Sequence, residues 1–217
     1  MRRLSGLLVL LLLAFLLGAC QETGADPCNP GGALLADDFS GAQNCGWALY
    51  SRSGATVEIA EGALTITSSQ PGQIWWTNPG REFADSVITV DAQKVSGPDD
   101  NAYGVICRYQ DVLNYYVFLI SSDGYYAIGR YVSGSNQIQY LTGGGQYVAS
   151  EVINQGTGVN QIQAACVGTQ LTLTVNGVEL ASVTDTTFGS GDIGLAASPF
   201  QPGTLTVQFT NFRATVP

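Results

Sequence analysis

Residues 161–183, QIQAACVGTQLTLTVNGVELASV, decide the fold class, because apolar and polar residues alternate on both sides of a tight turn. Successive side chains of a strand point to opposite faces, so alternation with a period of two is typical of strands. Asn-Gly between two such runs is a strong hairpin signal, since both turn residues need positive φ. The alternating apolar positions around Asn176-Gly177 are Leu171, Leu173, Val175, Val178, Leu180 and Val183.

The same pattern continues through most of the chain. A hairpin is predicted around Glu61-Gly62, and Ser122-Asp123-Gly124 joins two apolar runs, NYYVFLIS (114–121) and YYAIGRYV (125–132). Further strands are predicted over residues 88–92, 161–167, 193–197 and 204–216. One more strand is predicted to carry Tyr103, Val105, Cys107 and Tyr109 on a single face. About twelve to fourteen short strands with Gly-rich turns predict an all-β, two-sheet antiparallel β-sandwich of the jelly-roll type.

The first twenty residues indicate export. Met1-Arg2-Arg3 precedes an apolar run over residues 7–17, which is shorter than the roughly 20 residues that a membrane-spanning helix needs. A basic start, a short apolar run and small residues form a secretory signal peptide. Leu17-Gly18-Ala19-Cys20 resembles the bacterial lipobox, in which the Cys is lipidated; the alternative is an ordinary signal peptide with an incidental Cys.

This pattern divides the chain into three parts. Residues 1–19 are predicted to be a lipoprotein signal peptide, residues 20–33 the lipidated Cys20 with a Gly- and Pro-rich tether, and residues 34–217 one β-sandwich domain. The expected location is extracytoplasmic, at a bacterial outer membrane or cell surface, with the membrane contacted through the N-terminal lipid.

Charge and composition exclude several functions. The net charge is −9, and without residues 1–19 it becomes −11, from 6 basic and 17 acidic residues. Nucleic acid is therefore not an expected partner, because nucleic-acid affinity comes mainly from cations that neutralise phosphates. The chain contains no His, which excludes Ser-His-Asp and Cys-His catalysis and His-based zinc sites.

Four cysteines besides Cys20 favour two disulfides in an exported protein. Three pairings are possible from the count alone. Cys28–Cys45 is favoured because both lie in the N-terminal segment, and Cys107–Cys166 because both lie in apolar strand patterns. No CxxC spacing supports a metal site instead.

The order of motifs resembles the concanavalin A-like lectin/glucanase superfamily. The resemblance covers about residues 36–216 and rests on DDFSG, GALTI, YGVICRYQD, NYYVFLISSDGYYAIGRY, AACVGTQLTLTVNGVEL, FGSGDIGLAA and VQFTNF, with Trp47 after the first motif. It is strongest to laminin-G-like and 3-keto-disaccharide hydrolase-type domains. The resemblance implies a jelly roll and also supports pairing Cys107 with Cys166. It leaves function open, because this fold carries lectins, glycosidases and protein-binding modules.

Carbohydrate binding is the favoured function, through aromatic stacking and polar side chains. The candidate patch combines one Trp beside a turn with Tyr and Arg residues expected on outward faces; structural packing of the same aromatics is the alternative. The candidates are Trp76, Arg108, Tyr116, Tyr126 and Arg130.

Calcium is a candidate cofactor, since hard cations prefer several oxygen ligands and GPDDNAY (97–103) places three oxygen-bearing side chains in a turn. The candidate ligands are Asp99, Asp100, Asn101, Asp38 and Asn211; ordinary turn acids are the alternative.

No catalytic residue can be named. Glycosidases need two carboxylates across a cleft, and the alternating acids that glucanases carry on one strand are missing here. A glycoside-cleaving enzyme of the 3-keto-disaccharide hydrolase type remains one alternative function. A structural or protein-interaction module of the envelope, with a protein partner, is another.

Overall fold

The computed structural model describes residues 26–41 and 43–217. The predicted signal peptide and the lipidation of Cys20 lie outside these residues. Within them, no helix is both long enough and apolar enough to cross a membrane.

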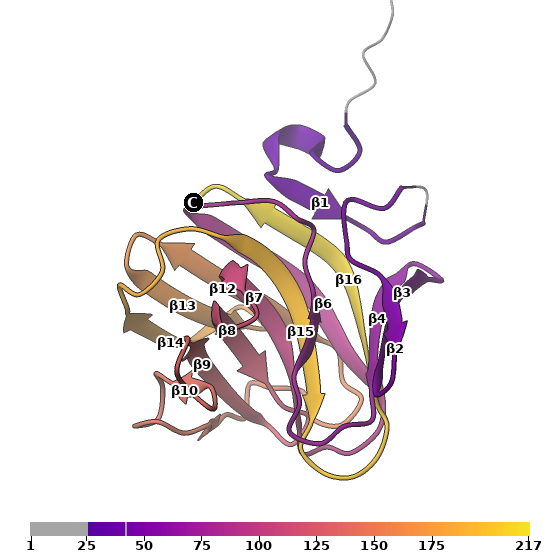
Figure 1. The fold of residues 1–217 in the computed structure, drawn as a ribbon, viewed down its shortest axis with the longest axis vertical. Coiled ribbons are helices and arrows are strands. Elements are labelled where there is room, and N and C mark those ends of the chain that lie inside the picture. Colours follow the sequence, from indigo (N-terminus) through magenta and orange to yellow (C-terminus); the bar gives the residue numbers. More distant parts are fainter. Residues whose placement is uncertain (1–25, 42) are drawn as a thin grey trace, which may run out of the picture.

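The described chain folds into two antiparallel sheets packed face to face (Figure 1). In the nine-stranded sheet the order is β14-β13-β12-β6-β16-β4-β3-β2, with β1 added to β16. Its strands are β1 (Leu35–Asp37), β2 (Tyr50–Arg52), β3 (Ala55–Ala60), β4 (Ala63–Ser68), β6 (Ser86–Ser96), β12 (Asn160–Val167), β13 (Gln170–Val175), β14 (Val178–Thr184) and β16 (Leu205–Thr215).

In the seven-stranded sheet the order is β10-β9-β8-β7-β15-β5, and β11 also pairs with β9. Its strands are β5 (Trp75–Thr77), β7 (Asn101–Asp111), β8 (Asn114–Ile120), β9 (Tyr125–Tyr131), β10 (Gln139–Tyr140), β11 (Val148–Ala149) and β15 (Asp192–Pro199). The one helical element of the described chain is a 3₁₀ turn, η1 (Pro30–Gly32).

The two-sheet all-β prediction is confirmed. The hairpins predicted around Glu61-Gly62, residues 122–124 and Asn176-Gly177 join β3 to β4, β8 to β9 and β13 to β14. Glu61 and Asn176 both adopt positive φ, as their turns require. The described chain has sixteen strands rather than twelve to fourteen, because it contains short strands of two or three residues that carry too few positions for alternation to show.

The main core lies between the sheets, where alternate residues of each strand meet. In β6, Ile88, Val90 and Ala92 point inward and are fully buried, against Tyr103 and other residues of the opposite sheet. Burying one such large apolar side chain contributes about 1.5–3 kcal/mol. This side of each sheet is its inner face.

The seven-stranded sheet has a second apolar layer on its outer face. Ala102, Ile106, Tyr115, Val117, Leu119 and Ala196 form a separate buried cluster there. Strand β8 is therefore buried on both faces, which explains why NYYVFLI is a continuous apolar run rather than an alternating one.

A β-bulge near the end of β7 changes which residues face inward. The register against β15 shifts by one residue, because Tyr109 pairs with Asp192 but Ile106 pairs with Gly194, and Arg108 has a φ of 50°. A one-residue shift exchanges the two faces of a strand. Tyr109 therefore joins the outer layer instead of sharing the face of Cys107, so that expectation was wrong.

The outward orientation expected for Arg108 was also wrong. Its side chain is only 2% exposed. The guanidinium donates to the backbone oxygens of Ala84 (3.0 Å) and Phe188 (2.9 Å) and pairs with Asp85 at 3.1 Å. Arg108 thus ties together two loops at the end of the sandwich.

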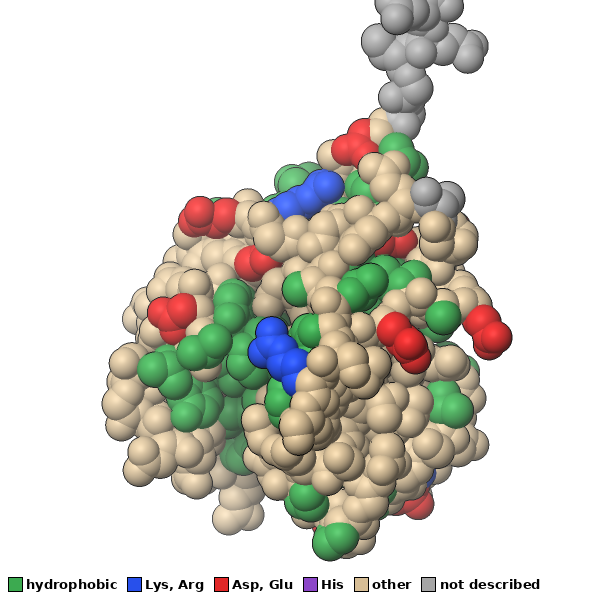
Figure 2. Space-filling view, turned by 45° about the vertical axis from the view of Figure 1, so that its right-hand side comes forward, with side chains coloured by type: hydrophobic (Ala, Val, Ile, Leu, Met, Phe, Trp, Pro, Cys, Tyr) green, Lys and Arg blue, Asp and Glu red, His purple; other side chains and the backbone are tan. Residues whose placement is uncertain are grey.

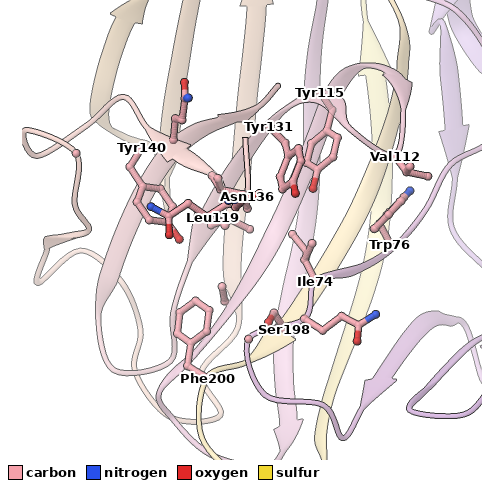
Figure 3. Close-up of a pocket in the computed structure, with 17 residues that line it drawn as sticks. Ile74, Trp76, Val112, Tyr115, Leu119, Tyr131, Asn136, Tyr140, Ser198 and Phe200 are labelled. Atoms are coloured by element: carbon pink, nitrogen blue, oxygen red, sulfur yellow. The ribbon is translucent and has the colours of Figure 1, made fainter. Parts of the chain in front are cut away.

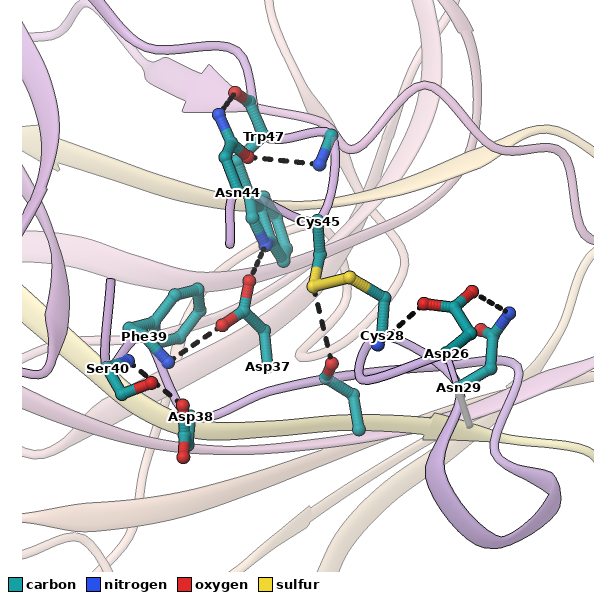
Figure 4. Close-up of a disulfide and its surroundings, with 12 residues drawn as sticks. Asp26, Cys28, Asn29, Asp37, Asp38, Phe39, Ser40, Asn44, Cys45 and Trp47 are labelled. Carbon is teal, nitrogen blue, oxygen red and sulfur yellow. Dashed lines mark hydrogen bonds between the residues drawn. A yellow bond between two sulfur atoms is a disulfide. The ribbon is translucent and has the colours of Figure 1, made fainter. Parts of the chain in front are cut away.

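The structure joins Cys28 to Cys45 and Cys107 to Cys166, the two pairings that were favoured. The second bond links the two sheets through β7 and β12. The first holds the start of the described chain beside Asp37, whose Oδ2 accepts a hydrogen bond from Trp47 Nε1 at 3.0 Å (Figure 4). Export to an oxidising compartment is compatible with both bonds.

Replacing Arg108 by Ala should destabilise the domain by about 2–3 kcal/mol, because the buried carbonyl of Phe188 loses its donor and an unpaired buried group is costly. Urea unfolding checks this. Arg52→Ala is the matched control, since Arg52 is exposed and its guanidinium lies over the Tyr50 ring, a contact of about 1 kcal/mol or less. Equal losses in the two variants would show that Arg108 is not a structural tie.

Candidate functional site

A hollow of about 690 Å³ lies on the outer face of the seven-stranded sheet. We call it the first hollow. Figure 3 shows Trp76 and Tyr140 on opposite sides of it, Tyr115 and Tyr131 together at one end and Phe200 at the other. The lining residues are Gly72, Gln73, Ile74, Trp76, Ala102, Val112, Tyr115, Leu119, Tyr131, Asn136, Gln137, Ile138, Gln139, Tyr140, Gly145, Ser198 and Phe200.

Four aromatic rings from four strands of the seven-stranded sheet form a row that runs from the first hollow, lined by Trp76, Tyr115 and Tyr131, to Tyr109 beside it. Trp76 comes from β5, Tyr109 from β7, Tyr115 from β8 and Tyr131 from β9. Ring centroids are 5.9 Å apart for Trp76 and Tyr115 and 5.7 Å for Tyr115 and Tyr131, the latter pair being stacked. These separations lie in the range of favourable aromatic pairs. We call these four residues the aromatic row.

The opposite wall comes from residues 136–147, which fold back over the sheet. Two residues of β10 pair with β9, and Ile138 packs over Gly129. A Cβ at Gly129 would lie 2.5 Å from Ile138 Cγ2, so the glycine lets this segment approach closely. Tyr140, Tyr147 and Phe200 make edge-on contacts that hold the wall, with centroids 4.9 Å apart for the first pair and 6.0 Å for the second.

Within the described chain, the lining of the first hollow contains no Asp, Glu, Lys or Arg. Its polar groups are amides and hydroxyls, chiefly those of Gln73, Asn136 and Gln137, which are exposed. Burial raises the pKa of Tyr115 and Tyr140 above the ordinary value of 10.0. These hydroxyls are therefore protonated at neutral pH, and the first hollow is electrically neutral.

A second hollow, of about 450 Å³, adjoins the first. Four residues line both, namely Gln73, Ile74, Trp76 and Val112. The second hollow also contains Tyr50 and Arg52 of β2. Trp76 is held between the two hollows, because its backbone pairs with Ala196 and its carbonyl accepts a hydrogen bond from Tyr50 Oη at 2.8 Å.

A third hollow of about 400 Å³ contains two carboxylates, Glu82 and Asp192. Asp192 Oδ2 accepts from the backbone N–H of Gly80 at 2.8 Å, and its Oδ1 accepts from Ile193 at 2.8 Å. Burial raises the pKa of Asp192, although these hydrogen bonds oppose the shift. Glu82 accepts a hydrogen bond from Ser190.

Of the five sequence-predicted binding residues, Trp76 alone lines the first or second hollow. Arg108 is the buried tie described above. Tyr116 and Tyr126 point into the main core, where Tyr126 Oη donates to the backbone oxygen of Leu180. Arg130 lies on the same side as Tyr116, its partner across the β8–β9 ladder. The structure therefore does not bring the five residues together on one surface.

Tyr116 and Arg130 do meet, at Asp185. Tyr116 Oη donates to Asp185 Oδ1 at 2.6 Å, and Arg130 Nη1 donates to Oδ2 at 2.6 Å. Tyr116 Oη also accepts from the backbone N–H of Phe188, and Arg130 also donates to Gln139 and Thr187. This network connects three strands with the loop that follows β14, so its role here is structural.

The predicted calcium ligands are engaged separately. Asp99 pairs with Lys94, Asp100 accepts from Gln201, and Asn101 contacts Ser122. Asp38 and Asn211 do lie beside the same small hollow of about 350 Å³. In the described part of the chain, no three His, Cys, Asp or Glu side chains gather as a metal site. Calcium binding stays a prediction.

Sequence reasoning missed most of the hollow's aromatic residues. Parity carries a usable signal for Tyr115. The two-residue turn at Val112-Leu113 pairs Asp111 with Asn114, so even residues of β8 lie opposite odd residues of β7, and the register shift of two residues farther along keeps this parity. Tyr116 therefore shares the face of Cys107, and Tyr115 takes the other face. No comparable signal exists for Tyr140 or Phe200, which reach the hollow from connecting segments and depend on tertiary packing.

No family model matches the chain, and no curated protein matches its sequence. Solved structures do match. A carbohydrate binding module, CBM66, from Bacillus subtilis superposes with a TM-score of 0.61 at 14% identity, over 78% of this chain and 95% of that one. The β-glucanase of Bacillus licheniformis gives 0.61 at 11% identity, over 87% and 100%. A Bacillus subtilis protein of unknown function with a galectin-like fold gives 0.61 at 11%, over 86% and 96%. At these identities the likeness shows the fold alone, a jelly-roll β-sandwich.

The Asp185 network predicts a pH-dependent contribution to stability. Burial raises the pKa of Asp185, but hydrogen bonds from Thr187 and Tyr116 and the charge of Arg130 lower it below 3.8 overall. A carboxyl whose folded pKa is lowered stabilises the fold above the unfolded pKa, and this stabilisation is lost as the pH falls through the folded value.

We therefore expect Asp185→Asn to cost about 2 kcal/mol near pH 7 and progressively less below about pH 4. Urea unfolding at a series of pH values measures the difference from the wild type. Glu58→Gln, at an exposed position on β3, is the control. A difference for Asp185→Asn that stays constant down to low pH would refute the assignment.

Proposed function

We propose that this domain binds a carbohydrate non-catalytically in the first hollow, displayed outside the cytoplasm on a lipid attached to Cys20. The location rests on the N-terminal sequence pattern and on the two disulfides, which favour an oxidising compartment. The binding function rests on the chemistry of the first hollow.

The neutral lining is the observation that carries the proposal. The chain has 17 acidic and 8 basic residues, yet none of these lines the first hollow in the described structure. Figure 2 shows acidic side chains scattered over one face of the molecule, with hydrophobic side chains gathered in one larger area beside a basic side chain and in several smaller ones. A sugar matches such a lining, because it is uncharged and offers apolar C–H faces to aromatic rings and hydroxyls to amides.

The aromatic row is also preorganised for binding. Tyr115 is only 1% exposed and is stacked on Tyr131, and Trp76 is fixed by its strand pairing and by Tyr50. Side chains that are already immobile lose little rotamer entropy when a ligand arrives, which favours affinity. Aromatic residues in desolvated positions are also the usual energetic centres of binding sites.

Glycoside cleavage is the second candidate function, and the third hollow is the observation that favours it. Glu82 and Asp192 line one hollow, and the pKa of Asp192 is raised by burial, as a general acid requires. Against this, both Asp192 oxygens accept backbone hydrogen bonds beside β5 and β15. A structural role for Asp192 accounts for these contacts, so binding is the better-supported function.

Trp76→Ala should weaken glycan binding at least tenfold, since the residue lines both hollows and loss of a central aromatic commonly costs more than 1.4 kcal/mol. The measurement is a glycan array with the soluble fragment 21–217, oxidised, with and without calcium, followed by calorimetry on the sugar that binds. Tyr125→Ala is the control, because Tyr125 is 41% exposed on β9 and does not line either hollow.

Saturable binding that is retained in Tyr125→Ala and lost in Trp76→Ala would support the proposal. Absence of binding by a folded, disulfide-bonded sample would overturn it. Binding that requires calcium would support the predicted cation site near Asp38 or Asp99.

The wild type should release no product from the glycan it binds, and Glu82→Gln should bind that glycan with unchanged affinity, because Glu82 lies outside the first hollow. Chromatography of reducing ends after long incubation tests the first point and calorimetry the second. Turnover that disappears in Glu82→Gln or Asp192→Asn would instead establish the enzyme.

A further inference from the structure

The second hollow differs from the first in carrying one cation. Arg52 lines it, and within the described chain no Asp, Glu or Lys does. The guanidinium lies 4.5 Å from the centroid of the Tyr50 ring, which also lines this hollow. A cation stacked on an aromatic face is oriented by that contact.

Basic residues are scarce in this protein, with 8 among 217 residues. Six of the eight basic residues lie in the described part. Three of these form ion pairs within it, namely Lys94 with Asp99, Arg108 with Asp85 and Arg130 with Asp185. The other three, Arg52, Arg81 and Arg213, form no ion pair among the described residues, and Arg81 contacts Asn29 and lies near Asp192. Of these three, Arg52 is the one that lines the second hollow, so it brings a charge without an ion pair to the edge of the neutral first hollow.

The two hollows are also continuous. Trp76, Ile74, Gln73 and Val112 line both, so a ligand stacked on Trp76 in the first hollow reaches the second without leaving the surface. Each hollow lies in the range of about 300–1,000 Å³ that holds one small ligand, so the pair accommodates more than a single sugar unit.

We infer that the groove recognises a glycan in which an acidic sugar adjoins neutral ones: the neutral part occupies the first hollow, and the carboxylate or sulfate of the adjoining unit pairs with Arg52 across Trp76. This inference rests on the proposed function and adds the ligand's class. The planar guanidinium fits a carboxylate or sulfate through two parallel hydrogen bonds. The acidic protein surface selects against polyanions, so a single acid beside a neutral run is the matching pattern.

Paired probes test the inference. Each pair is a neutral oligosaccharide and the same oligosaccharide with one acidic substituent: xylo-oligosaccharides with and without a glucuronic acid branch, and N-acetyllactosamine with and without sialic acid or sulfate. In at least one pair the acidic member should bind about fivefold more tightly at low salt. This gain should vanish near 1 M salt, where the screening length is about 3 Å.

Variants assign the gain to one residue. Arg52→Gln should remove the gain, so that the two members of a pair bind with equal affinity, and Arg52→Lys should keep part of it. Arg213→Gln is the matched control, because Arg213 is exposed and lines a different hollow. It should leave the gain intact.

The outcomes separate this inference from the function on which it rests. Binding of neutral sugars with no gain in any acidic pair, or a gain that survives Arg52→Gln, would overturn the inference and leave the proposed function standing. Absence of binding by every probe would overturn both.

Discussion

Burial of β7 and β8 on both faces is the constraint on which the rest of the structure depends. The inner face packs into the core of the sandwich, and the outer face carries Tyr115, Val117 and Leu119, which also avoid water. An antiparallel sheet commonly leaves one face to solvent, so a second apolar face must be covered. Residues 136–147 cover one part of it, and the first hollow is the part that this segment leaves open. The hydrophobic layer that stabilises the sheet is thus the same layer that offers a platform for a ligand.

Charged side chains do not line the first hollow in the described chain. Buried or partly buried acids are used as structural acceptors: Asp37 binds Trp47, and Asp185 joins Tyr116 to Arg130. Asp99 pairs with Lys94, the one lysine of the chain. Most Asp side chains that accept backbone hydrogen bonds lie at turns or at the ends of strands, where backbone N–H groups are available. A charged side chain beside an apolar layer is costly to remove from water, and this cost keeps charged residues out of the first hollow.

The fold was predictable because it depends on local patterns. Alternation identified the long strands, and Asn-Gly identified a hairpin where the structure has one. Of the five binding residues predicted from the sequence, only Trp76, next to its turn, lines the first hollow. The orientation of Arg108 was predicted wrongly because a one-residue bulge leaves no mark in hydrophobic periodicity. Tyr140 was missed because its position depends on how residues 136–147 fold back over Gly129. Phe200 was missed because it follows β15 and reaches the hollow through its packing against Tyr147, a contact distant in sequence.

The predicted binding role of Tyr116 has a different weakness, because the pairing of β7 with β8 places this residue in the main core. The same pairing shows how the outer-face site can be found from the sequence. A hairpin with a two-residue turn fixes the parity of facing residues, so placing Cys107 in the core also places Tyr116 and Phe118 there. The remaining positions of NYYVFLI, Tyr115, Val117 and Leu119, must then form the opposite face. An exposed strand face made of Tyr, Val and Leu would be a large apolar patch, which soluble domains seldom leave uncovered without a partner. The parity of one hairpin therefore predicts that a covering segment or a ligand lies on the outer face. In this protein residues 136–147 cover one part of that face, and the first hollow is the part that stays open.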